Sequence, residues 1–175
     1  MTPTESAAAK PQLITPTFVL AWVANFCQFL VFYLSVTTMA LYAVESFGAS
    51  DTVGGFASSA FVLGATCMRV FSGWIVDRVG HKKAALTSLV FVTVVAVAYF
   101  FAHNVAVLII VRMVHGAGYA LTSTALMAVA QSVIPHERRA EGTGYFALGT
   151  TLATAFGPAI GLFLANNIGY TTLFA

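Results

Sequence analysis

Charged side chains are scarce in this chain, and most of them gather in short turns between long apolar runs. Only 8% of its 175 residues are Asp, Glu, Lys or Arg, and 59% are hydrophobic, whereas soluble chains are roughly 25% charged. The stretch Gly73–Lys83 alone concentrates five ionisable side chains between two apolar runs of membrane-spanning length. A soluble domain of this size has too little interior to hide so much apolar surface. The sequence therefore predicts an all-α integral membrane protein.

Residues that begin or end helices separate the apolar runs and set the predicted spans. Pro16 suits the first turn of a helix, where its missing N–H does no harm, and Pro135 ends a later run. Crossing a hydrocarbon core takes about 20 helical residues. We therefore expect a disordered cytoplasmic tail over 1–15 and a transmembrane domain over 16–175, with helices at about 17–44, 52–76, 83–102, 105–133 and 140–165 and the start of a sixth at 168–175.

The positive charges lie on alternate sides of the predicted spans. Of the eight Lys and Arg, six lie in the tail and in two of the turns, namely Lys10, Arg78, Lys82, Lys83, Arg138 and Arg139. The other predicted turns carry none. Because cytoplasmic loops are enriched in Lys and Arg, this asymmetry predicts a multi-pass protein of the cell (inner) membrane with a cytoplasmic N-terminus.

The charged turn also resembles the signature loop of the major facilitator superfamily. That pattern runs Gly, three residues, Asp-Arg, one residue, Gly-Arg-Arg/Lys between the second and third transmembrane helices. Here Gly73, Asp77, Arg78, Gly80, Lys82 and Lys83 fit, while His81 replaces an Arg. The resemblance implies the N-terminal half of the family's 12-helix fold, which is built from two inverted three-helix repeats. It also implies that these residues act as a gating loop.

Two arginines fall inside predicted helices. Arg112 is the more unusual, because a membrane-embedded charge is costly unless it faces protein or water. Steps of three and four from it reach His115, Tyr119 and Thr122, a polar stripe on an apolar helix. A purely structural pairing of Arg112 is the alternative. For Arg69, two turns before Asp77, the simplest interpretation is snorkelling toward the headgroups.

The surroundings of Arg112 resemble a second pattern of the same family, Arg, two residues, Gln-Gly, one residue, Gly, one residue, Ala. His115 stands where that pattern has Gln. The resemblance implies a role for Arg112 in proton coupling. Together with His115, Tyr119, and Asn25 and Gln28 on the first helix, it forms the predicted coupling or substrate cavity. Ordinary hydrogen bonds between helices would also explain Asn25 and Gln28.

The fifth predicted helix carries Gly157, Pro158 and Gly161. Glycines one turn apart let helices approach closely, and the proline frees a backbone carbonyl. The segment partly resembles the Gly-Pro signature that the family associates with antiporters, with Ala153 in place of its first glycine and Leu162 in place of its last. Helix packing alone is an equally good explanation.

Other kinds of chemistry find no support in the sequence. It has no nucleotide-binding loop, metal-ligand spacing or nucleophile triad, and its four histidines are scattered, so we expect no enzyme, no cofactor and no metal. A net charge of +2 is too small to indicate nucleic acid. Cys27 and Cys67 lie in apolar runs and are expected to be free, buried thiols.

The expected function is therefore secondary active transport of a small organic solute. We expect proton-coupled export (antiport) by alternating access, with the lipid bilayer, the substrate and protons as partners. A sugar or organic-acid importer of the same superfamily is one alternative. The other is a non-transporting helical membrane module that needs a missing C-terminal half or a second chain.

Overall fold

The computed structural model describes residues 11–169, which form five long α-helices and no strand. The helices are α1 (Pro16–Phe47), α2 (Asp51–Val79), α3 (His81–Val97), α4 (Val105–Val133) and α5 (Arg139–Ile168), and short 3-10 turns occupy Ala98–Phe101 and His136–Arg138. The predicted all-α fold is confirmed. The predicted residues 1–10 of the tail and 170–175 of the sixth helix lie outside the described residues.

Helix starts follow local capping chemistry. The Thr15 side chain accepts a hydrogen bond from the Phe18 N–H, and Pro16 occupies the first turn. Ser50 and Asn104 cap α2 and α4 in the same way. These side chains satisfy backbone donors that the first turn of a helix leaves without partners.

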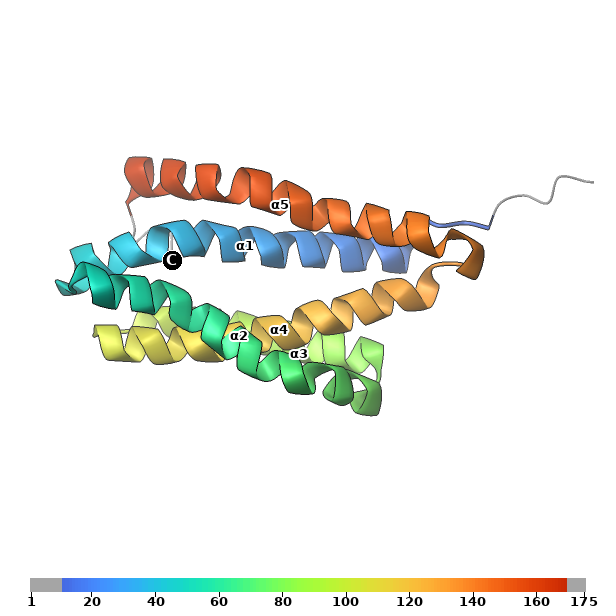
Figure 1. The fold of residues 1–175 in the computed structure, drawn as a ribbon, viewed down its shortest axis with the longest axis horizontal. Helices are drawn as coiled ribbons and strands as arrows, with labels where there is room; N and C mark the ends of the chain where they lie inside the picture. The colour runs from blue at the N-terminus through green and yellow to red at the C-terminus, as the bar shows by residue number, and fades with distance from the viewer. Residues whose placement is uncertain (1–10, 170–175) are drawn as a thin grey trace, which may run out of the picture.

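The five helices run alongside one another along the longest axis of the molecule (Figure 1). The α2–α3 and α4–α5 connections lie at the end where α1 begins, and the α1–α2 and α3–α4 connections lie at the opposite end. Each helix, with its adjoining 3-10 turn where it has one, is long and apolar enough to cross a membrane. Much of the outer surface consists of large apolar side chains, such as Val70, Trp74 and Phe163, as a lipid-facing surface requires.

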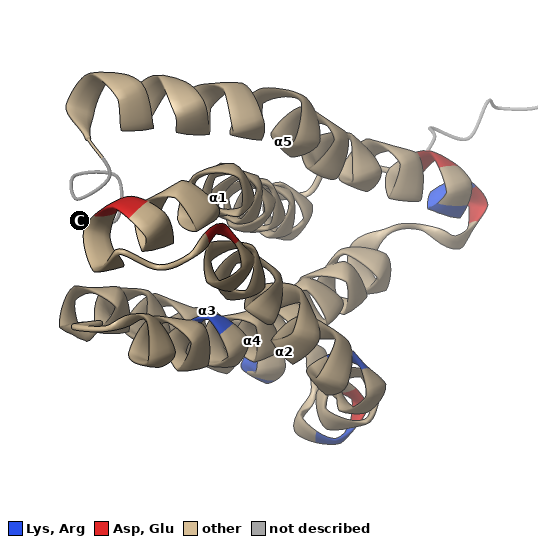
Figure 2. Cartoon of the chain, turned by 60° about the vertical axis from the view of Figure 1, so that its left-hand side comes forward, with Lys and Arg blue, Asp and Glu red and all other residues tan. Residues whose placement is uncertain are grey.

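Charged residues lie mainly near the ends of the bundle (Figure 2). Lys and Arg occur at the α2–α3 and α4–α5 connections, whereas Glu45 and Asp51 lie where α1 turns into α2. Arg138 and Glu141 form the one ion pair within residues 11–169, at 2.7 Å. The two exceptions to this end placement are Arg69 and Arg112, which lie within α2 and α4.

The α2–α4 pair makes the most extensive contact in the described bundle, and glycines make that contact possible. A Cβ on Gly64 would overlap the Met113 carbonyl, and one on Gly116 would overlap the Phe61 carbonyl. Each helix therefore contributes a glycine that admits the backbone of the other. The resulting approach is closer than any residue with a side chain would permit.

The α1–α5 pair comes second in extent, and its glycines belong to α5 alone. A Cβ on Gly157 would lie 2.5 Å from the Tyr33 Cβ, and one on Gly161 would lie 3.0 Å from the Leu34 carbonyl oxygen. Two inverted three-helix repeats exchange α1 with α4 and α2 with α5. Under that exchange the α1–α5 pair corresponds to the α4–α2 pair. These two pairs make the two most extensive helix contacts, as the predicted architecture requires.

The structure corrects the predicted local structure of the charged turn. The α2 helix continues through Asp77 and Arg78 to Val79, and α3 begins at His81. Gly80 alone forms the connection, with a φ of 92° that glycine adopts without strain. Nothing in the neighbouring residues breaks a helix, and their charges lie outside the apolar part of each span. The stretch is thus a helical corner rather than an open loop.

Two smaller predictions are also wrong. The disordered tail predicted over 1–15 does not extend to residue 15. Leu13 is only 2% exposed and packs in a cluster with Phe18 and Phe146. The thiols of Cys27 and Cys67 are free but exposed on the bundle rather than buried. An apolar run gives no indication of which of its faces points toward lipid.

Candidate functional site

Arg112 is the most deeply buried charged residue among those described, with no exposed surface. Its Nη2 donates to the Ser58 carbonyl oxygen of α2 at 3.1 Å, and its guanidinium lies 4.8 Å from the centre of the Phe61 ring. The Nε atom is buried without a hydrogen-bond partner. Arg112 therefore joins α4 to α2 beside the close contact of Gly64 and Gly116.

Ser58 extends this connection to a third helix. Its hydroxyl donates to the Val36 carbonyl of α1 at 2.9 Å, while its own carbonyl accepts from Arg112. One turn along α4 from Arg112, His115 Nδ1 lies 3.1 Å from the Tyr99 hydroxyl. These contacts tie α1, α2, α4 and the 3-10 turn after α3 into one polar cluster at the centre of an apolar bundle.

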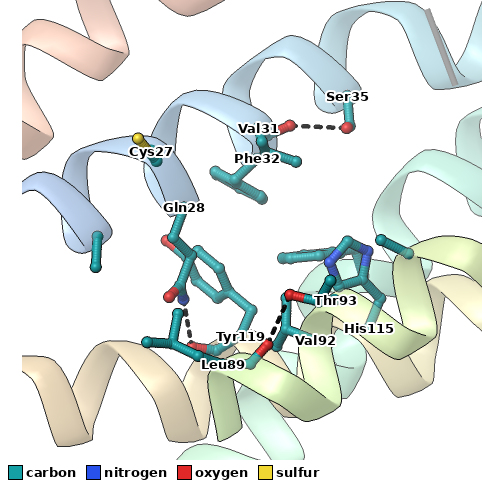
Figure 3. Close-up of a pocket in the computed structure, with 13 residues that line it drawn as sticks. Cys27, Gln28, Val31, Phe32, Ser35, Leu89, Val92, Thr93, His115 and Tyr119 are labelled. Atoms are coloured by element: carbon teal, nitrogen blue, oxygen red, sulfur yellow. Dashed lines mark hydrogen bonds between the residues drawn. The ribbon is translucent and has the colours of Figure 1, made fainter. Parts of the chain in front are cut away.

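Gln28, His115 and Tyr119 line a cavity of about 280 Å³ bounded by α1, α2, α3 and α4 (Figure 3). The Gln28 amide donates to the Tyr119 carbonyl at 2.8 Å, and its buried oxygen has no partner. Apart from these groups the walls are mostly apolar, with Ser35 and Thr93 bonded to carbonyls of their own helices. Its lining residues include no Lys, Arg, Asp or Glu, so this cavity offers little to a charged ligand.

The structure divides the residues of the predicted coupling or substrate cavity. Gln28, His115 and Tyr119 share one cavity, Asn25 opens onto another, and Arg112 is not among the lining residues of either. All five are at most 9% exposed. They face neighbouring helices of the same bundle instead of an open surface.

A second cavity, of about 470 Å³, lies between α1, α2, α4 and α5. Arg69 of α2 lines this cavity. The interpretation of Arg69 as a side chain that reaches toward the headgroups did not include a cavity. The cavity is otherwise lined by amide, hydroxyl and apolar side chains, namely Asn25, Phe29, Ser123, Thr124, Met127, Phe146, Ala147, Thr150 and Thr151. Asn25 Nδ2 donates to Thr150 Oγ1 at 3.3 Å and links α1 with α5.

Sequence reasoning missed this second site for two reasons. Its hydroxyls come from one turn of each of two helices, and most of them are bonded locally, as when Thr124 donates to the Ala120 carbonyl at 2.9 Å. They therefore look like ordinary helix residues. Arg69 itself was a visible signal, because an intramembrane arginine indicates a functional site by default.

The predicted gating residues lie at the α2–α3 corner. The Arg78 guanidinium lies 5.4 Å from the centre of the Trp74 ring one turn earlier on α2. Asp77, Lys82 and Lys83 are exposed. Within residues 11–169 Asp77 forms no ion pair, which leaves its carboxylate open to another partner.

The remaining predicted residues pack helices together. Gly157 and Gly161 lie against α1, and Pro158 is inside α5. In the part of the chain that the structure describes, no group of three or more His, Cys, Asp or Glu side chains is placed to hold a metal ion.

Five membrane-length helices surrounding internal cavities define a multi-pass membrane protein of the kind that the sequence predicts. The family profile of the Major Facilitator Superfamily matches residues 21–175. The chain therefore belongs to the Major Facilitator Superfamily, as its sequence motifs indicated, and this places it among transporters rather than enzymes.

Three relatives illustrate the similarity. The chain is 30% identical over 161 residues to the multi-drug resistance efflux pump PmrA of Streptococcus pneumoniae, covering 89% of this chain and 39% of that protein. It is 32% identical over 123 residues to the staphylopine export protein of Staphylococcus aureus, covering 69% and 31%. It is 24% identical over 148 residues to the quinolone resistance protein NorA of Staphylococcus aureus, covering 83% and 38%. The chain thus spans about two fifths or less of the length of each.

Proposed function

We propose that this chain is part of a secondary active transporter that exports a small organic solute in exchange for protons by alternating access. The observation that carries the proposal is the cavity between α1, α2, α4 and α5, which places Arg69 and several hydroxyls inside a membrane bundle. The relatives named as efflux and export proteins support the outward direction.

Energised everted membrane vesicles that contain the full-length protein test this function. We expect respiration to drive one of two fluorescent solutes, the cation ethidium or the anion carboxyfluorescein, into the vesicles and a protonophore to abolish that uptake. Control vesicles from cells without the protein should accumulate far less. Accumulation in right-side-out vesicles alone would favour an importer. Absence of flux in both orientations, with ethidium and with carboxyfluorescein, would favour a non-transporting module.

The cell (inner) membrane and a cytoplasmic N-terminus form part of the same proposal. The placement of Arg78, Lys82 and Lys83 at the α2–α3 corner supports it, because positive charge favours the cytoplasmic side. In a background without Cys27 and Cys67, His81→Cys and Ser50→Cys should react with an impermeant thiol reagent from opposite sides. Labelling of both from one side would contradict the topology.

We assign the gating role to the α2–α3 corner, where the exposed Asp77 is available to another part of the full-length protein or to a second chain. In the full-length protein, Asp77→Asn should slow transport with little change in expression, because it keeps the shape and removes the charge. Arg78→Lys should be tolerated better than Arg78→Ala. Transport at the normal rate in Asp77→Asn would exclude this role.

We assign proton coupling to the cluster of Arg112 and His115, with Tyr119 and Gln28 as its polar surroundings, and we assign Asn25 to the cavity that Arg69 lines. The guanidinium and the imidazole lie one turn apart on α4, and each holds α4 to a neighbouring element, α2 in the case of Arg112 and the 3-10 turn after α3 in the case of His115. Arg112 is thereby a positioning residue for α2, which is a different role from contact with the solute.

A further inference from the structure

We infer that the exported solute is an organic anion and that Arg69 holds its carboxylate in the cavity between α1, α2, α4 and α5. The inference rests on the proposed function, since it assigns a chemical class to the solute of that function. It concerns a residue outside every sequence motif identified above.

The charge of the cavity is the first argument. Arg69 is the one ionisable side chain among the ten residues that line it. Within residues 11–169 its guanidinium forms no ion pair, and it makes no hydrogen bond there. It lies eight residues before Asp77, which is about 12 Å along the helix, so it is well inside the span. An unpaired charge at such depth favours the entry of an anion and disfavours that of a cation.

Accessibility separates Arg69 from the other intramembrane arginine. Arg112 has no exposed surface and already donates to the Ser58 carbonyl, so a solute cannot reach it without separating α2 from α4. Arg69 is exposed and lines a space of about 470 Å³, within the range of roughly 300–1,000 Å³ typical of small-molecule sites. The planar guanidinium fork matches a carboxylate with two parallel hydrogen bonds.

The other lining residues indicate which further groups the solute carries. The hydroxyls of Ser123 and Thr124 donate to the carbonyl of Ala120 on their own helix, at 3.1 and 2.9 Å, so their oxygens remain as acceptors. Acceptors suit hydroxyl or amine donors of a ligand. Phe29, Met127 and Phe146 add an apolar wall. The fitting solute is an amphipathic organic acid that also carries hydrogen-bond donors.

Binding of a fluorescent anion to the purified full-length protein tests the inference. Carboxyfluorescein, an aromatic carboxylate, is titrated by fluorescence anisotropy in nanodiscs of phosphatidylcholine, with the cation ethidium in parallel. We expect Arg69→Gln to weaken carboxyfluorescein binding by about tenfold or more, because it removes a charge-assisted bidentate contact. Arg69→Lys should retain part of the affinity. Arg139→Gln removes an exposed arginine at the start of α5 and is the matched control, with unchanged affinity.

Three outcomes overturn the inference. They are no saturable carboxyfluorescein binding, equal losses in Arg69→Gln and Arg139→Gln, and an equal loss of ethidium binding in Arg69→Gln. The third would indicate damage to the cavity rather than loss of an anion site. Circular dichroism of each variant verifies that the helices remain folded.

A lipid headgroup could supply the same anion, and a second set of nanodiscs distinguishes the two sources. If phosphatidylglycerol competes with carboxyfluorescein in the unmodified protein and not in Arg69→Gln, Arg69 binds lipid and the solute assignment is wrong. The transport assay stays separate. Arg69-dependent anion binding without flux contradicts the proposed function alone. Ethidium flux without Arg69-dependent anion binding contradicts the inference alone.

Discussion

The α2–α4 and α1–α5 pairs hold equivalent places in two inverted repeats, yet they are built differently. In the α2–α4 pair each helix has a glycine that admits the other's backbone, and the buried Arg112 bonds across the contact. In the α1–α5 pair only α5 supplies glycines, and α1 has none. Mutual insertion fixes both helices along and around their axes, whereas one-sided insertion constrains α5 more than α1. We expect α2–α4 to be the rigid pair and α1–α5 the one that yields.

Among the variants considered, Gly116→Ala is expected to lower the stability of the protein the most. Its Cβ would overlap the Phe61 carbonyl, which is backbone and cannot rotate away. Overpacking of this kind costs about 1–3 kcal/mol and sometimes more, and we expect the upper end. Thermal unfolding in detergent measures it, with Gly55→Ala of α2 as the control, since nothing lies within 4 Å of a Cβ there. Equal unfolding temperatures for Gly116→Ala and Gly55→Ala would show that α2 and α4 can separate slightly without loss of stability.

Arg112 comes next. Arg112→Ala should lose the bond to Ser58, and hydrogen bonds to charged groups contribute about 1.5–3 kcal/mol. Arg112→Lys should preserve most of the stability and lose much of the transport of the full-length protein, because an ammonium cannot both reach Ser58 and lie flat on Phe61. Paired unfolding and flux measurements separate the two effects. Normal flux in both variants would show that Arg112 has a structural role and no role in transport.

Gly157→Ala should cost less than Gly116→Ala. Its Cβ would lie 2.5 Å from the Tyr33 side chain, but the nearest α1 backbone atoms are 3.5 Å away, so α1 can shift. We expect about 1 kcal/mol, the low end of overpacking penalties. Gly144→Ala on the same helix is the control, with open space around it. A cost equal to that of Gly116→Ala would contradict the proposed difference between the pairs.

Trp22→Phe should have the smallest effect. It removes the bond from the indole N–H to the Tyr145 carbonyl at 2.9 Å, which joins α1 to α5 near their starts. A single neutral hydrogen bond contributes about 0.5–1.5 kcal/mol, and we expect the low end of that range. The same unfolding assay detects the change. A larger loss than that of Gly157→Ala would show that hydrogen bonding, more than close packing, holds this pair.

The number of helices and their order follow from the sequence because membrane spans need long apolar runs, and residues such as Pro16 and Asn104 mark their starts. The polar face of α4 was also predictable, since Arg112 and His115 recur at helical spacing. What lies opposite that face was not. Spacing along one helix carries no information about the neighbouring helix, and here Arg112 packs against α2 while His115 lines a cavity.

The Arg69 cavity shows the same limitation more strongly. Four helices contribute to it, and most of its hydroxyls are bonded within their own helices, so no single stretch has an unusual pattern. The α2–α3 corner was predictable as a charged turn from Gly80 and its basic neighbours. Its helical structure depends on the absence of helix breakers around Asp77, a weaker signal than the charges themselves.

The one-residue corner at Gly80 has a consequence for biosynthesis. A connection this short cannot stretch across a bilayer, so α2 and α3 are constrained to enter the membrane together as a hairpin. In the proposed topology Arg78, Lys82 and Lys83 flank the corner on the cytoplasmic side, where their charges resist translocation. A side chain at residue 80 would strain the backbone at φ 92°. Gly80 is therefore important when the chain is inserted, before any gate has formed.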